Sequence, residues 1–199
     1  CLRSLEKFAA GFNQKVIVTP FSSHTVIHPL AVEFGWEYDC CERLAKEDYV
    51  GQQGTKMMAD LWCRGDIICF VDSDQVFKRP FCPSDLVDGD GRVKLLKTRY
   101  ETIECPWKSI TEQIVGFSVE WEYMRRLPLS YPKELLPLAR NHIEQRHGRT
   151  FEQFISEIKG GCLSEFNVLG AIGEKLTPEL FSMQDTNSGL ELPPLFAKQ

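Results

Sequence analysis

The sequence predicts an α/β fold, with a mixed sheet flanked by helices, and three observations support this prediction. Residues 67–71 are five consecutive apolar residues, which are typical of a strand buried on both faces of a parallel sheet. Residues 15–19, rich in β-branched side chains, and residues 93–97 predict further strands. Helical spacing of apolar residues over 2–12 and 49–64 predicts helices that alternate with these strands.

Weaker signals cover other parts of the chain. Alternating apolar and acidic residues predict a strand at residues 36–40. Prolines predict that residues 127–138 form a loop with at most a short helix. Thr150 and Gln153 have the spacing of a capping box, which predicts a helix over residues 151–159.

Length and composition are those of one globular domain over residues 1–199, with 43% hydrophobic and 26% charged residues. The net charge of −5 provides no basic surface of the kind that binds nucleic acid. No run of about 18 apolar residues is present, so we expect no membrane span. The eight cysteines form no CxxC pair, and we expect them to be reduced, as in a cytoplasmic protein.

Two aspartates, Asp72 and Asp74, directly follow the central predicted strand. Carboxylates at the C-terminal end of a buried strand lie where open α/β sheets bind their ligands. Two carboxylates this close can share one divalent cation, and the cation can hold the phosphates of a substrate. The sequence therefore predicts a site for a cation and a phosphorylated ligand at this end of the strand.

The strand followed by residues 72–74 (Asp-Ser-Asp) resembles the DxD motif of GT-A glycosyltransferases. Residues 52–56 (Gln-Gln-x-x-Lys) resemble the segment that these enzymes place just before the motif. Residues 164–170 resemble the SE-x-x-x-x-G block of the glycosyltransferase-like family DUF6492. The resemblance extends over residues 2–170 and implies a GT-A-like (Rossmann-like) domain. Residues 1–100 would be its nucleotide-sugar-binding half, 101–180 its acceptor half and 181–199 a tail.

The resemblance also implies a reaction, the transfer of a sugar from a UDP- or GDP-sugar to a glycan or another hydroxyl acceptor. Asp72 and Asp74 would hold Mn²⁺ or Mg²⁺, and Asp185 is the nearest candidate by type for a third ligand. Glu165 would be the catalytic base, and Asp74 would also take part in catalysis. The donor would be bound by Gln52, Gln53, Lys56, Asp72 and Ser73.

Some of these residues also have purely structural interpretations. Gln52, Gln53 and Lys56 have the spacing of a solvated helix face. Ser164 and Glu165 have the pattern of a helix start, with a capping serine and a glutamate that favours the helix dipole.

Other parts of the sequence raise separate questions. His24 and His28 have the i, i+4 spacing of metal ligands on a helix, but no third ligand is visible nearby, so we expect surface histidines. The chain begins with Cys1 inside a helical pattern, whereas a GT-A domain places a strand before this helix. We therefore expect the given sequence to lack the first strand and part of the nucleotide pocket.

Two alternative functions remain open. An apolar strand followed by Asp-x-Asp also describes haloacid-dehalogenase-type phosphohydrolases, in which Asp72 would be the nucleophile. That chemistry needs a downstream lysine, for which Lys94 or Lys97 are candidates, and an acidic pair after another strand, which is missing. The third possibility is a GT-A-like module that binds or supports without catalysis.

Overall fold

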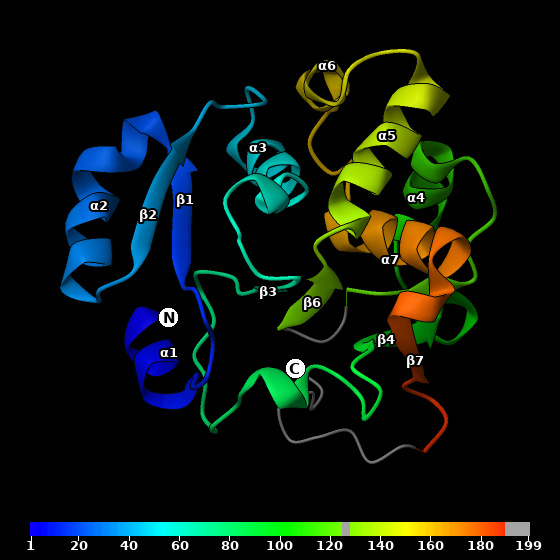
Figure 1. Ribbon diagram of the computed structural model, residues 1–199. Helices are drawn as coiled ribbons and strands as arrows, with labels where there is room; N and C mark the ends of the chain where they lie inside the picture. The colour runs from blue at the N-terminus through cyan, green and yellow to red at the C-terminus, as the bar shows by residue number, and fades with distance from the viewer. Residues whose placement is uncertain (125–127, 190–199) are drawn as a thin grey trace.

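Helices and short strands form a mixed α/β fold, and they alternate from α1 to β3 (Figure 1). The computed structural model describes residues 1–124 and 128–189. The helices are α1 (Leu2–Phe8), α2 (His24–Glu33), α3 (Asp48–Lys56), α4 (Trp107–Val115), α5 (Leu135–His147), α6 (Phe151–Glu157) and α7 (Glu165–Leu176). The strands are β1 (Val16–Pro20), β2 (Glu37–Cys41), β3 (Ile67–Phe70), β4 (Val93–Arg99), β5 (Trp121–Glu122), β6 (Leu129–Pro132) and β7 (Phe181–Asp185).

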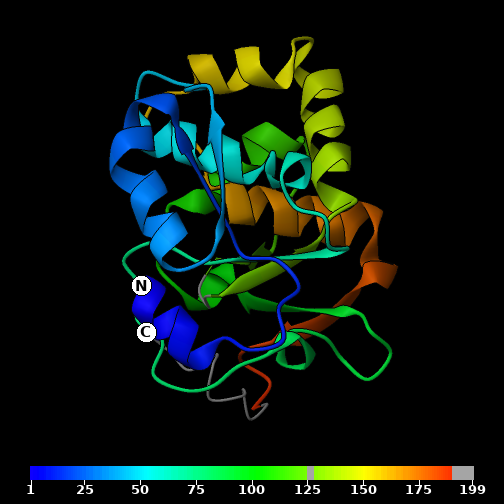
Figure 2. The ribbon, with the colours of Figure 1, turned by 60° about the vertical axis from the view of Figure 1, so that its left-hand side comes forward.

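The strands of the described residues form three small sheets. β1 and β2 pair in parallel, with Val16 opposite Glu37. β3 and β6 pair antiparallel, and β4 lies between antiparallel β5 and parallel β7. β4 also contacts β6, so the second and third sheets lie side by side. Figure 2 shows α3, α5, α6 and α7 on one side of these two sheets and α1 on the other.

The central strand differs from its prediction in one respect. β3 forms where the apolar run predicts it, but it pairs antiparallel with β6 rather than in parallel. Ile68 and Phe70 are buried, whereas Ile67 is 38% exposed. Side chains alternate between the two faces of a strand, and both faces of β3 meet apolar packing: Ile68 and Phe70 belong to the main core, while Cys69 on the opposite face packs against smaller clusters that include Phe81 and Leu96. An apolar run alone does not report the direction of pairing.

The predicted loop over residues 127–138 is wrong for the part that the structure describes. Here β6 is followed after two residues by α5. Pro132 ends the strand, and Pro137 lies in the first turn of the helix, where a backbone N–H has no partner within the helix. Both prolines occupy positions that regular structure tolerates, so they mark boundaries rather than a loop.

The predicted tail over residues 181–199 is also wrong where it is described. Phe181 is buried, and β7 pairs in parallel with β4 through Leu95 and Met183. This long-range pairing gives a strand to a segment that has no strong local pattern. Residues 190–199 of the predicted tail lie outside the described residues.

The main hydrophobic core lies around α7. All nine residues from Glu165 to Gly173 are buried, and Phe166 contacts the rings of Phe70 and Tyr131. A Cβ atom added to Gly170 would collide with the ring of Tyr123. This glycine, the last residue of the SE-x-x-x-x-G block, therefore has a packing role. Within the described residues, no helix has the length and apolar character needed to cross a membrane.

Candidate functional site

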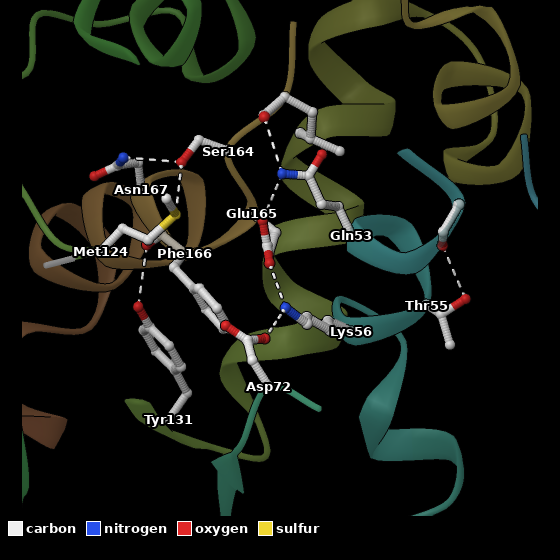
Figure 3. Close-up of polar contacts among 12 residues, drawn as sticks. Gln53, Thr55, Lys56, Asp72, Met124, Tyr131, Ser164, Glu165, Phe166 and Asn167 are labelled. Atoms are coloured by element: carbon white, nitrogen blue, oxygen red, sulfur yellow. Dashed lines mark hydrogen bonds and ion pairs between the residues drawn. The ribbon is translucent and has the colours of Figure 1, made fainter. Parts of the chain in front are cut away.

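The three sequence blocks that resemble a glycosyltransferase converge on one ammonium group (Figure 3). Lys56, at the C-terminal end of α3, donates to Asp72 Oδ1 over 2.7 Å and to Glu165 Oε1 over 3.0 Å. Asp72 lies two residues beyond β3, and Glu165 is the first residue of α7. Residues that are 16 and 109 positions apart in the sequence thus share one set of charges. Lys56 of the helix block therefore contacts Asp72, one of the two aspartates that follow β3.

Gln53 lies one helical turn before Lys56 and completes this set of contacts. Its Nε2 donates to Glu165 Oε2 over 2.8 Å and to the carbonyl of Leu163 over 3.0 Å. Both oxygens of the Glu165 carboxylate are therefore hydrogen-bonded, one by Lys56 and the other by Gln53. Gln53 is buried, so the interpretation of this residue as part of a solvated helix face is wrong. Its Oε1 is buried and has no hydrogen-bond partner among the described residues.

The charges of this cluster, defined as Gln53, Lys56, Asp72 and Glu165, are strongly coupled. The Lys56 side chain is 16% exposed, that of Glu165 is 3% exposed and that of Asp72 is 29% exposed. Burial by itself would lower the pKa of Lys56, but the charge of Glu165 and the hydrogen bond to Asp72 outweigh it and raise this pKa. Lys56 is therefore a firmly protonated cation between two carboxylates.

Tyr49 is a residue of this region that the sequence analysis missed. It precedes Gln53 by four positions and Lys56 by seven, so the three lie on one face of α3. The pKa of Tyr49 is raised, first by burial and then by the negative charge of Glu165. The residue is nevertheless 51% exposed, which places an aromatic ring at the solvent side of the cluster. The i, i+4, i+7 spacing of Tyr49, Gln53 and Lys56 is the sequence signal that would have placed Tyr49 beside the other two.

The remaining predicted site residues lie outside these contacts. Ser73 and Asp74 are exposed in a turn that the backbone N–H of Gln75 closes on the carbonyl of Asp72. Gln52 is exposed on α3, in accord with the solvated alternative. Asp185 lies on β7 and accepts a hydrogen bond from the backbone of Asn187, which makes it part of a turn.

Ser164 does not act as the predicted helix cap. It occupies the N-cap position of α7, but its side chain makes no capping hydrogen bond. The hydroxyl instead accepts from Asn167 Nδ2 over 2.9 Å, and Asn167 Oδ1 accepts from the backbone of Tyr123. Ser164 and Asn167 thus hold the start of α7 against the segment around Tyr123, and this fixes the position of Glu165.

Among residues 1–124 and 128–189, no group of three or more His, Cys, Asp or Glu side chains is arranged to hold a metal ion. Mg²⁺ and Mn²⁺ do not require such a group of three protein ligands, because these ions are often bound by one or two carboxylates together with substrate phosphates. Asp72 and Asp74 supply hard oxygen donors of the right kind at an accessible position. These are donors of the type that a divalent cation takes, and Asp72 Oδ1 is paired with Lys56.

The lysines considered for a phosphohydrolase are engaged elsewhere. Lys94 Nζ donates to the carbonyl of Asp85 over 3.1 Å. Lys97 pairs with Glu174 and lies over the ring of Trp121. The lysine that contacts Asp72 is Lys56, which precedes it in the chain.

The cluster is defined by the contacts of Lys56 and Gln53 within this chain. Comparisons of the whole chain with protein-family models, with curated proteins and with solved structures find no match.

Proposed function

We propose that the protein is a metal-dependent glycosyltransferase of the GT-A type, which moves a sugar from a UDP- or GDP-sugar to a glycan or another hydroxyl acceptor. The observation that carries this proposal is the convergence of Lys56, Asp72 and Glu165, each from a different one of the resembling blocks. A cation site, a lysine and a carboxylate base are the groups that such a transfer needs. The candidates for these groups, Asp72, Lys56 and Glu165, share one set of hydrogen bonds.

The donor would bind at the solvent side of the cluster. Asp72 and Asp74 would hold Mn²⁺ or Mg²⁺, which neutralises the charge of the leaving diphosphate as a Lewis acid. Lys56 is protonated and would contact the same diphosphate. The exposed Gln52 and Ser73 would offer hydrogen bonds to the donor, whereas the buried Gln53 would act on it through Glu165, to which it donates.

Glu165 would accept the proton of the acceptor hydroxyl. As described, Lys56 occupies its Oε1, so the base becomes available when Lys56 turns toward the diphosphate. Gln53 would retain Oε2 and keep the carboxylate in place. The acceptor oxygen then forms the new bond to the sugar, while the bond from the sugar to the diphosphate breaks and the diphosphate leaves with its electron pair.

A cytoplasmic location is part of the proposal. All eight cysteines are free, which is the state that a reducing compartment maintains.

The test is thermal unfolding with UDP, GDP and their sugar conjugates, with and without Mn²⁺. A ligand that binds the folded state stabilises it by about 2.7 kcal/mol at 100 times its dissociation constant. We expect stabilisation that requires Mn²⁺ and is reduced in Asp72→Asn and in Asp74→Asn. Asp90→Asn is the matched control, because Asp90 is an exposed aspartate in the separate turn that begins at Asp88.

Beryllium fluoride separates the transferase from the phosphohydrolase. It mimics an aspartyl phosphate and would stabilise a protein in which Asp72 is the nucleophile. We expect no stabilisation, because in a transferase the acceptor hydroxyl attacks the sugar. Stabilisation by beryllium fluoride with none by nucleotides would overturn the proposal. Nucleotide binding without any release of nucleoside diphosphate would instead favour the non-catalytic module.

A further inference from the structure

A second cluster of ligand-type side chains lies away from Lys56, on α2 and β2. The imidazole rings of His24 and His28 stack with centroids 4.8 Å apart, and the ring of Tyr38 packs against both. Cys40 Sγ lies 3.7 Å from His24 Nδ1. The sequence showed the two histidines but no third ligand, and the fold supplies one from the neighbouring strand.

The topology explains why these residues meet. His24 is the first residue of α2, and His28 lies one turn further along the same face. Tyr38 and Cys40 are two positions apart on β2, so they share a face of the two-stranded β1–β2 sheet. Figures 1 and 2 show α2 lying along this sheet, at the outer side of the molecule.

We propose that His24, His28 and Cys40 bind a transition-metal ion of the zinc class. An ion about 2.3 Å from a sulfur and about 2.05 Å from a nitrogen, with tetrahedral angles, holds these two atoms about 3.6 Å apart. The distance between Cys40 Sγ and His24 Nδ1 is 3.7 Å, close to this value. Two of the three ligands thus already have the separation that an ion requires.

His28 is the side chain that must move. Its ring lies nearly parallel to that of His24, with 19° between the planes, so both rings cannot direct a nitrogen at one ion. This agrees with the absence of a ready three-ligand group among the described residues. Both histidines are exposed, so His28 can turn its ring without disturbing the core. Water would supply the fourth ligand.

The packing of α2 gives the ion a structural effect. Ala31 is the single buried residue of this helix, so few apolar contacts hold it on the sheet. An ion shared by His24, His28 and Cys40 would tie α2 to β2. The thiol of Cys40 would release its proton to solvent on binding, because the thiolate is the ligand. Thiolate and imidazole ligands favour Zn²⁺ and Co²⁺ over Mg²⁺ or Mn²⁺, so this site is chemically distinct from Asp72 and Asp74.

The test is titration of the reduced protein with Co²⁺ alone, followed by optical absorption. A near-ultraviolet band for charge transfer from thiolate to cobalt reports a sulfur ligand, and the visible bands report the coordination geometry. We expect both in the unmodified protein, and we expect Cys40→Ser to abolish the charge-transfer band. His24→Ala and His28→Ala should each weaken Co²⁺ binding at least as much as loss of an outer-shell partner, about 10–100-fold.

Two matched variants control this titration. Cys162→Ser removes an exposed thiol outside the cluster and should leave the band unchanged. Asp72→Asn should also leave it unchanged, which separates this site from that of the proposed transferase. A band that persists in Cys40→Ser, or Co²⁺ binding that His28→Ala does not weaken, would overturn the proposal. Absence of the band in the unmodified protein would overturn it as well.

Discussion

The N-terminal and C-terminal parts of the molecule are held together very differently. In residues 1–41, α1 and α2 bury one side chain each, Leu5 and Ala31, and the strand β1 is only half-buried throughout. In the C-terminal part, α7 buries nine consecutive residues and packs on α4 and α5. Large apolar side chains of the N-terminal part, such as Val26 and Val32, are instead exposed.

This difference indicates where the site obtains its rigidity. Glu165 is fixed by the most buried helix of the described residues, while Asp72 lies in a half-exposed turn. Lys56 contacts both carboxylates. The base of the proposed reaction is therefore held firmly, and the ligands of the proposed cation can adjust to the donor.

The largest expected difference in the free energy of unfolding is between breaking the buried Lys56–Glu165 pair and breaking the exposed Arg64–Glu37 pair. Lys56→Met should lower the free energy of unfolding by about 3–5 kcal/mol, because it leaves the buried Glu165 carboxylate without its counter-charge. Arg64→Met removes the partner of Glu37 in a pair whose side chains are 70% and 44% exposed, and should leave stability unchanged. Urea denaturation measures both.

A second substitution identifies the cause. Lys56→Met combined with Glu165→Gln should recover part of the lost stability, since no buried charge then remains unpaired. Equal losses for Lys56→Met and Arg64→Met would contradict the contrast between the two parts.

A smaller effect is expected from one pair of leucines. Leu169→Ala on α7 should cost about 2–5 kcal/mol, because the side chain is fully buried and its removal leaves a cavity. Leu30→Ala on α2, where the side chain is 38% exposed, should cost less than about 1 kcal/mol. The measurement is again urea denaturation, with circular dichroism to confirm that both variants fold. A larger loss for Leu30→Ala would place the main core elsewhere.

The smallest effect is a pH dependence of the Lys56 contribution. The pKa of Lys56 in the folded protein is raised above its ordinary value of 10.5, so the ion pair stabilises the fold fully below that pH. The contribution is lost as the pH rises through the higher pKa of the folded state. The stability difference between the unmodified protein and Lys56→Met should therefore be constant from about pH 8 to about pH 10 and shrink above it. A constant difference up to about pH 12 would show that Lys56 acts through packing rather than charge.

The sequence predicted the order of most elements because their signals are local. Thr150 Oγ1 accepts from the backbone of Gln153, and Gln153 Oε1 accepts from the backbone of Thr150, so the predicted capping box is confirmed. The capping box depends only on residues within one helical turn. The contact of Lys56 with Asp72, which the resemblance assigns to one donor site, joins residues 16 positions apart and follows from no local pattern.

What the sequence did not predict depends on contacts between distant segments. The pairing of Lys56 with Glu165 joins residues 109 positions apart, and no local pattern reports it. The pairing of β6 with β3 and of β7 with β4 likewise converts weak segments into strands. Cys40 could not be recognised as a neighbour of His24, because the strand must first pack against the helix.

The most direct test of the proposed function is whether this one cluster binds a cation together with a nucleoside diphosphate. Electron paramagnetic resonance of Mn²⁺ measures the free ion, whose signal falls when it binds protein. With UDP or GDP present, we predict a loss of signal in the unmodified protein that exceeds the loss from nucleotide alone, is largely absent in Asp72→Asn and is retained in Asp90→Asn. Mn²⁺ binding that is absent with both nucleotides, or equal in the unmodified protein and Asp72→Asn, would contradict the account.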